Sequence, residues 1–162
     1  MRRTFYAVCD VQHQKLDPAA ALEFVSDPNF GAITSFVGRV RARNQGRIVT
    51  AIRYDLFEPL VLQVFRDFGD SAMAKFGKDL KLYIAHAVGT LQVGELAVVV
   101  AAGTPHRDEA FSACRMAIEA VKHTAPIWKQ EHYEDGKSEW SEGCSLCQPS
   151  QEEGIKGDRG DA

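Results

Sequence analysis

The stretch K-H-T-A-P-I-W-K-Q-E, from Lys122 to Glu131, marks the point where a long helix gives way to a strand. Upstream of it, apolar residues recur at helical spacing and predict a helix from about Pro105 to Thr124. Pro126 cannot continue that helix, and it biases Ala125 toward extended backbone. The chain therefore changes direction between two lysines that lie seven positions apart.

Working outward, the sequence predicts an alternation of strands and helices. A second long helix is expected from Glu58 to Gly77, and a short one opens at Asp17-Pro18 and runs to about Val25. Beyond the quoted stretch, an E-D-G-K turn predicts a hairpin with Asp-Gly at its tip. The expected strands cover residues 4–11, 32–42, 48–57, 80–88 and 96–102, and Gly46 provides the turn between the second and the third. This order is typical of an α+β domain with a mixed or antiparallel sheet and two long helices.

Composition and charge are those of an ordinary globular protein. The 162 residues are 45% hydrophobic and 25% charged, with a formal net charge of −3, and this length allows one domain with a sizeable core. Such a charge gives no overall field for nucleic acid or an anionic membrane, so an anion site must come from local clustering. No apolar stretch is long enough for a signal peptide or a membrane span. We therefore expect a cytoplasmic protein whose cysteines are free thiols.

The composition changes after Gly143, which sets the expected domain boundary. Residues 1–143 form the predicted domain, whereas residues 144–162 are polar, glycine-rich and short of large apolar residues, so we expect a flexible tail. The tail contains one C-x-x-C pair, Cys144 and Cys147. A single pair without a second pair or nearby histidines is a weak signal for zinc or redox chemistry, and no metal site is predicted.

Three arginines alternate in V-G-R-V-R-A-R-N-Q-G-R, so Arg39, Arg41 and Arg43 would share one face of a strand. Two interpretations are open at this point. The arginines could form a solvated edge-strand face that discourages aggregation. They could instead hold phosphate through their planar guanidinium groups, which would suit a non-catalytic phosphate- or nucleotide-binding module on the basic face from Arg39 to Arg47.

A second candidate anion site lies at the start of the helix that leads to Lys122. Thr104 and Pro105 favour a helix start, which places His106 and Arg107 in the first turn, where free backbone N–H groups favour an anion. The alternative, that His106 and Arg107 are simply polar first-turn residues, stays open.

The two lysines of the opening stretch are the third candidate. A helical projection places Lys122 in a narrow arc with Phe111 and Ile118, on the apolar side of the helix. The amine could extend along that surface into water, or it could face a pocket, where partial desolvation strengthens its charge. Lys129 projects from an extended segment, and Trp128 points to the opposite side.

The helix length separates two of these candidates. His106 and Lys122 lie sixteen residues apart on one helix, so ~24 Å separates their backbones. A small substrate cannot touch both from the same copy. If both serve one site, a second chain must supply one of them, which predicts a dimer with composite sites.

Five segments in this order resemble the catalytic (large) subunit of molybdopterin synthase. They are F-V-G-R-V-R-x-x-N-x-G (36–46), Y-D-L-F-E-P-L (54–60), G-x-L-x-x-G-E (89–95), H-R (106–107) and K-H-T-A-P-I-W-K (122–129). The resemblance covers about residues 3–142. It implies an α/β hammerhead-type fold and a homodimer in which each copy binds a small ubiquitin-like sulfur carrier, giving a heterotetramer. It further implies a sulfurtransferase that moves sulfur from the carrier's C-terminal Gly-Gly thiocarboxylate to cyclic pyranopterin monophosphate, forming the dithiolene of molybdopterin without a metal or other cofactor.

The resemblance also implies site residues. Lys122 and Lys129 match the two pocket lysines of the family and are the expected catalytic residues. Arg41 matches its basic residue after the G-x-V segment, and His106 with Arg107 match its H-R pair, so we expect these three to bind substrate together with Arg39. A cationic pocket suits this reaction, because the substrate carries a phosphate and the donor is an anionic thiocarboxylate.

The sequence departs from the family pattern at its end. The family commonly has a further basic pocket residue after a W-x-E segment, which is Trp140-Ser141-Glu142 here, but G-C-S-L-C-Q-P follows and offers no counterpart. Arg159 lies too deep in the predicted tail to take this role. Whether Lys137 or Arg39 replaces the missing residue is left open by the sequence.

Overall fold

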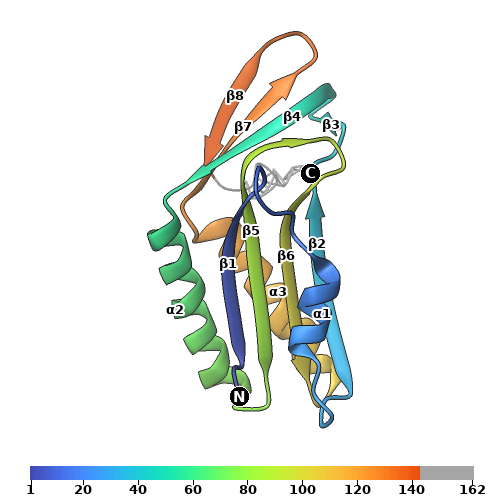
Figure 1. Ribbon diagram of the computed structural model, residues 1–162, viewed down its shortest axis with the longest axis vertical. Coiled ribbons are helices and arrows are strands. Elements are labelled where there is room, and N and C mark those ends of the chain that lie inside the picture. The colour runs from blue at the N-terminus through green and yellow to red at the C-terminus, as the bar shows by residue number, and fades with distance from the viewer. Residues whose placement is uncertain (143–162) are drawn as a thin grey trace, which may run out of the picture.

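Eight strands and three helices are formed by residues 1–142, the part of the chain that the computed structural model describes (Figure 1). The strands are β1 (Thr4–Asp10), β2 (Ala32–Arg39), β3 (Arg43–Asn44), β4 (Arg47–Leu56), β5 (Lys81–Gln92), β6 (Leu96–Thr104), β7 (Ile127–Tyr133) and β8 (Ser138–Glu142). The helices are α1 (Pro18–Val25), α2 (Glu58–Phe76) and α3 (Arg107–His123). None of these helices is long and apolar enough to cross a membrane.

The strands form one mixed sheet in the order β2-β6-β5-β4-β7-β8, with β1 parallel to β5 and β3 antiparallel to β4. The 12-residue strand β5 belongs to both parts of this sheet. Its first part pairs with β1 and β6, and its last four residues, from Gly89 to Gln92, pair with β4. Strands β4, β7 and β8 thereby form an upper part that is set at an angle to the lower strands (Figure 1). The predicted α+β class with a mixed sheet is confirmed.

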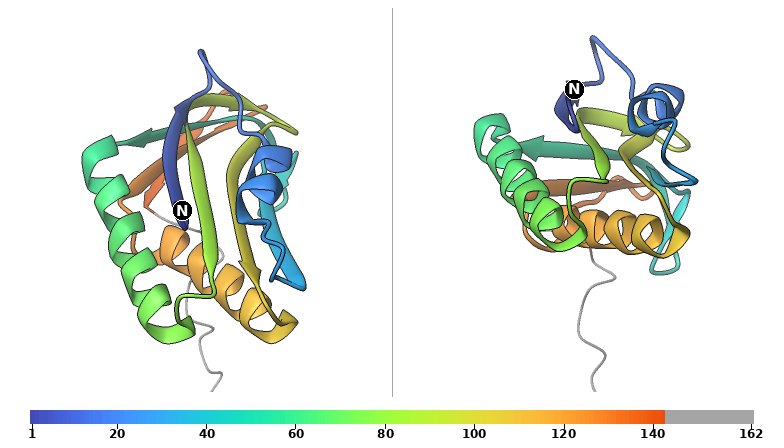
Figure 2. Two further views of the ribbon diagram at one scale, coloured as in Figure 1. Left: turned by 60° about the horizontal axis from the view of Figure 1, so that its bottom comes forward. Right: turned by 90° about the horizontal axis from the view of Figure 1, so that it is seen from below.

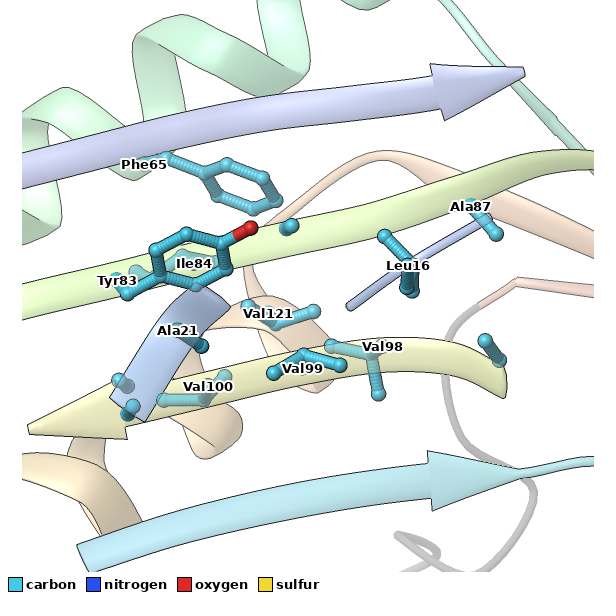
Figure 3. Packing of buried hydrophobic residues seen from close by; sticks show 14 of the residues in the cluster. Leu16, Ala21, Phe65, Tyr83, Ile84, Ala87, Val98, Val99, Val100 and Val121 are labelled. Carbon is cyan, nitrogen blue, oxygen red and sulfur yellow. The ribbon is translucent and has the colours of Figure 1, made fainter. Parts of the chain in front are cut away.

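Helices cover both faces of the lower part of the sheet. Helix α1 lies against one face, and α2 and α3 lie side by side against the other (Figure 2). The core between these layers takes Ala21 from α1, Ile84 from β5, Phe65 from α2 and Val121 from α3, each at most 3% exposed (Figure 3). Burial of a large apolar side chain of this kind contributes about 1.5–3 kcal/mol.

Local signals in the sequence predicted several elements correctly. Asp17 caps α1, because its carboxylate accepts a hydrogen bond from the Ala19 N–H at 2.9 Å. The β7–β8 hairpin has its turn at E-D-G-K, where Gly136 takes a φ of +79° that other residues avoid. The prediction of a flexible tail with the Cys144–Cys147 pair lies outside the described residues.

The strands predicted at residues 32–42 and 48–57 are present as β2 and β4, but they do not pair with each other across the turn at Gly46. Strand β2 ends at Arg39 and pairs with β6, with a register shift between Gly38 and Arg39. The following residue, Val40, is bonded to the β5–β6 turn, since its N–H donates to the Glu95 carbonyl and its carbonyl accepts from the Gly94 N–H. The turn at Gly46 instead joins β4 to the two-residue strand β3.

The predicted apolar side of α3 is also partly wrong. Phe111 is 61% exposed, whereas the residues that face the sheet are mostly small. The buried set is Ala110, Ala113, Cys114, Ala117 and Val121. Small side chains let the helix lie close to β2 and β6, so the larger Phe111 and the half-buried Ile118 lie beside this contact. In helix α2, likewise, Val61 is buried whereas its neighbour Leu60 is half exposed.

Candidate active site

A cleft of about 450 Å³ lies between the C-terminal end of α3, the end of β2 and the face of β4 and β7 that points toward α3. Its floor is apolar and includes Val49, Ile52 and Tyr54 of β4. Four cationic side chains from three separate segments line it, and they are Arg39, Arg41, Lys122 and Lys129. The structure therefore brings together four of the six site residues predicted from the sequence.

The α3–β7 junction places the two lysines on the same cleft. Helix α3 ends at His123, and the Ile127 N–H donates to the Ala125 carbonyl at 2.8 Å, which reverses the chain into β7. Alternation along β7 then turns Lys129 toward the cleft and leaves Trp128 45% exposed on the other side. The sequence prediction for this junction is confirmed.

Lys129 is held by a buried carboxylate that the sequence analysis missed. Its Nζ lies 3.1 Å from Oε1 of Glu131, whose side chain is only 7% exposed. The other oxygen of Glu131 accepts hydrogen bonds of 2.5 Å from the Tyr133 hydroxyl and from the Asn44 amide. Burial raises the pKa of Glu131, but the hydrogen bonds from Tyr133 and Lys129 and the charge of Lys129 outweigh it, so the pKa lies below its usual value. Glu131 is therefore an anion that fixes Lys129.

The same network reaches Arg41 through Asn44. The Arg41 Nη2 donates to Asn44 Oδ1 at 3.2 Å, and the Asn44 amide in turn donates to Glu131. One hydrogen-bonded chain thus links Arg41 to Lys129 across the end of the cleft. A signal for part of it was present in I-W-K-Q-E-H-Y, where Lys129, Glu131 and Tyr133 alternate and so share one face of the strand.

The arginines from Arg39 to Arg47 do not form the continuous basic face that the sequence suggested. The register shift after Gly38 breaks the alternation, and the Arg39 Nε donates to the Gly94 carbonyl at 3.2 Å. Arg43 is exposed and does not line the cleft. Arg47 lies over the Tyr133 ring at 3.5 Å and forms ion pairs with Glu139 at 2.7 Å and with Asp135 at 3.3 Å. A phosphate site that uses the whole face from Arg39 to Arg47 therefore has no geometric support.

His106 and Arg107 lie at the other end of α3 and do not line the cleft of their own chain. His106 is the N-cap residue, its side chain makes no capping hydrogen bond, and Arg107 begins the helix. Both are exposed. Their separation from Lys122 agrees with the helix-length argument, and their part in the reaction stays a prediction.

Other predicted features lie away from the cleft. Lys137 is in the β7–β8 turn, where its N–H donates to Asp135, and it does not line the cleft. Arg159 lies outside the described residues. Within residues 1–142, no group of three or more histidine, cysteine or acidic side chains is arranged to hold a metal ion.

A cleft with four convergent cations defines a site for a small anionic substrate. The comparisons with known proteins agree with this description. Residues 11–124 match the model of the MoaE protein family. The molybdopterin synthase catalytic subunit of Synechococcus elongatus is 46% identical over 142 residues, which cover 88% of this chain and 86% of that protein. The chain therefore belongs to the MoaE family.

Solved structures show the same fold. A molybdopterin synthase from Staphylococcus aureus superposes with a TM-score of 0.76 at 29% identity, covering 87% of this chain and 98% of that one. A complex of subunits 1 and 2 of the molybdopterin-converting factor from Helicobacter pylori gives a TM-score of 0.64 at 24% identity, covering 86% and 88% of the two chains.

Proposed function

We propose that this chain is the catalytic subunit of a molybdopterin synthase, a sulfurtransferase of molybdenum cofactor biosynthesis. It transfers sulfur from the thiocarboxylated C-terminus of a small ubiquitin-like carrier to cyclic pyranopterin monophosphate, which becomes the dithiolene of molybdopterin. The observation that carries this proposal is the convergence of Lys122, Lys129, Arg39 and Arg41 on one cleft of a MoaE-family chain.

The cleft suits the charges of both substrates. A thiocarboxylate and a phosphate are anions, and cations fixed in advance stabilise negative charge that develops during the transfer. We assign Lys122 to the carrier's terminal carbonyl, where it stabilises that charge while water adds to the carbonyl carbon and the carbon–sulfur bond breaks, which leaves the carrier with an ordinary carboxylate. Lys129 orients the pterin and assists proton transfer at the carbons that accept sulfur. Arg39 and Arg41 bind the phosphate and the edge of the pterin.

The partner in this proposal is the small sulfur carrier. A Gly-Gly tail has no side chains beyond hydrogen, so it can enter a narrow cleft as extended backbone. The Helicobacter pylori relative was solved as a complex of two different subunits, which supports a two-subunit enzyme here as well.

A second copy of this chain completes the proposed site. Strand β2 is at an edge of the sheet, and Ile33, Phe36 and Val37 on it are 36–44% exposed. Phe36 lines one hollow with the exposed Phe111 of α3. Exposed apolar side chains on a sheet edge favour pairing of two copies. Antiparallel pairing here would bring His106 and Arg107 of each copy toward the cleft of the other, giving two composite sites in a homodimer and a heterotetramer with the carriers.

A cytoplasmic location and a reaction that needs no metal or other cofactor are further parts of the proposal.

The test combines the purified chain, a thiocarboxylated carrier and cyclic pyranopterin monophosphate, and measures the dithiolene product. We expect product with the thiocarboxylated carrier and none with the same carrier bearing an ordinary carboxylate. Salt-sensitive binding of phosphorylated ligands without any dithiolene would instead support the non-catalytic phosphate- or nucleotide-binding module.

A further inference from the structure

A second, much smaller cavity lies behind the two lysines. Its volume is about 20 Å³, which is enough for a single water molecule. Tyr54 of β4, His86 of β5, Lys122 of α3 and Lys129 of β7 line it, together with the apolar Val121 and Ile127. Tyr54, Lys122 and Lys129 also line the cleft. The small cavity therefore adjoins the proposed active site and shares three side chains with it.

His86 is a titratable residue of this cavity to which the reaction so far assigns no role. It is 2% exposed, and its Nδ1 lies 2.7 Å from the Ala87 carbonyl oxygen. A carbonyl can only accept, so Nδ1 is the protonated nitrogen of the ring. The Tyr54 ring packs edge-on against the imidazole, with centroids 5.0 Å apart and an interplanar angle of 78°. These two contacts fix both the tautomer and the orientation of the ring.

The imidazole is also neutral. Burial, followed by the positive charge of Lys122, lowers the pKa of His86 to about 4, although the bond to Ala87 acts in the opposite direction. The ionisable groups around it on the small cavity are Tyr54, Lys122 and Lys129, from three different elements. At neutral pH the second ring nitrogen, Nε2, is therefore unprotonated and can accept a hydrogen bond.

We propose that His86 is a positioning residue for Lys122. Its Nε2 accepts a hydrogen bond from the Lys122 ammonium, directly or through one water molecule in the small cavity, and so holds the amine toward the cleft. This inference rests on the proposed function, in which Lys122 stabilises charge on the carrier's carbonyl.

A neutral acceptor suits this task better than a carboxylate would. Lys129 is paired with the Glu131 anion, so much of its positive charge is compensated locally. His86 can orient Lys122 without adding a negative charge beside it, because an imidazole nitrogen accepts a hydrogen bond while the ring stays uncharged. The contact with His86 thus adds no compensating charge to the ammonium group, and it supplies the hydrogen bond that a buried polar ring needs among apolar residues.

A matched pair of substitutions tests the acceptor. In His86→Gln the side-chain amide can place its oxygen near the position of Nε2, whereas His86→Asn can keep a donor near Nδ1 but provides no acceptor at Nε2. With saturating carrier and pterin, we expect the turnover of His86→Asn to fall by ~10- to 100-fold and that of His86→Gln to stay within ~3-fold of the wild type. KM values and unfolding temperatures should be similar in the two variants. The proposal would be overturned by equal turnover in the two variants, or by losses of turnover that merely follow the losses of stability.

A second measurement does not depend on catalysis. Titration of the His86 ring by NMR in the wild type and in Lys122→Met should show that the pKa of His86 rises by ~0.5 to 1 unit when the lysine charge is removed. An unchanged pKa means that Lys122 does not lie next to the ring, and the proposal fails even if the wild type forms product. A wild type that forms no dithiolene but shows the pKa rise would overturn the proposed function while supporting the contact between His86 and Lys122.

Discussion

The two ends of α3 carry the two halves of the predicted active site, but they differ in their surroundings. At the C-terminal end, Lys122 is half-buried and lines both the cleft and the small cavity with His86. At the N-terminal end, His106 and Arg107 are exposed, and the nearby Phe111 is 61% exposed.

This difference shows how one helix can serve two sites. A 17-residue helix is too long for one small substrate to touch both ends. A two-fold axis that sets two such helices antiparallel would place the exposed end of one beside the buried end of the other. The exposed groups at the N-terminal end are then parts of a neighbouring site.

The largest effect is expected at the C-terminal end. Lys122→Ala or Lys129→Ala should lower dithiolene formation by ~1000-fold or more, because each removes a charge that acts on the reacting groups. Carrier binding should change little in both variants. The unfolding temperature should change little in Lys122→Ala but fall in Lys129→Ala, because the buried Glu131 carboxylate loses its cation. The measurement is product formation in single-turnover assays, and full activity in both variants would disprove the assignment of these lysines.

A mixing experiment tests the N-terminal end directly. Arg107→Ala alone should also be strongly impaired. When Lys122→Ala and Arg107→Ala chains are unfolded and refolded together, half of the dimers are hybrids with one intact composite site, so about a quarter of the wild-type activity should return. Separately refolded variants mixed without exchange are the control. If no activity returns although hybrid dimers form, both halves of the site come from one chain.

A smaller effect is expected from the anion that holds Lys129. Glu131→Gln should lower activity by ~10-fold and should change the pH dependence of stability. The folded-state pKa of Glu131 lies below its ordinary value of 4.5, so its stabilising contribution is present above pH 4.5 and is lost as the pH falls through the lower folded-state value. Unfolding temperatures of the wild type and the variant should therefore converge below this range, and a constant difference at all pH values would contradict the assignment.

The smallest effect on activity is expected from a structural ion pair near the N-terminal end of α3. The buried Lys81 contacts Asp27 at 3.4 Å and donates to the Ser26 carbonyl at 2.8 Å. This loop also reaches the start of α3, since the Gly31 N–H donates to the Pro105 carbonyl. Asp27→Asn should lower the unfolding temperature by only a few degrees, since one ion pair is lost, and should leave turnover unchanged. A large loss of activity would show that this loop shapes the composite site.

The local features of the site could be predicted from the sequence. Pro126 and the alternation after it place Lys129 and Trp128 on opposite sides of a strand. The helical projection placed Lys122 on the apolar side of its helix with Phe111, whereas the structure leaves Phe111 exposed. The alternating arginines left two interpretations open for Arg41, and the family resemblance favoured its role in substrate binding. The alternation of Lys129 and Glu131 along the strand could have indicated their pairing. The roles of Asn44 and His86 depend on strands that meet only in the folded chain, so no spacing in the sequence reports them. The prediction that Arg39, Arg41 and Arg43 share one face of a strand was wrong, because the register shift after Gly38 depends on the pairing of β2 with β6.

The hydrogen bond between Asn44 and Glu131 joins positions 87 residues apart, and this separation has a consequence for synthesis of the chain. During translation, Arg41 and Asn44 leave the ribosome well before the partner carboxylate does. Domains dominated by such distant contacts fold late and slowly. The anion-binding cleft therefore cannot form on a nascent chain until β7 has emerged, so an unfinished chain lacks the carboxylate that fixes Lys129 and cannot present a complete cleft to the carrier's tail.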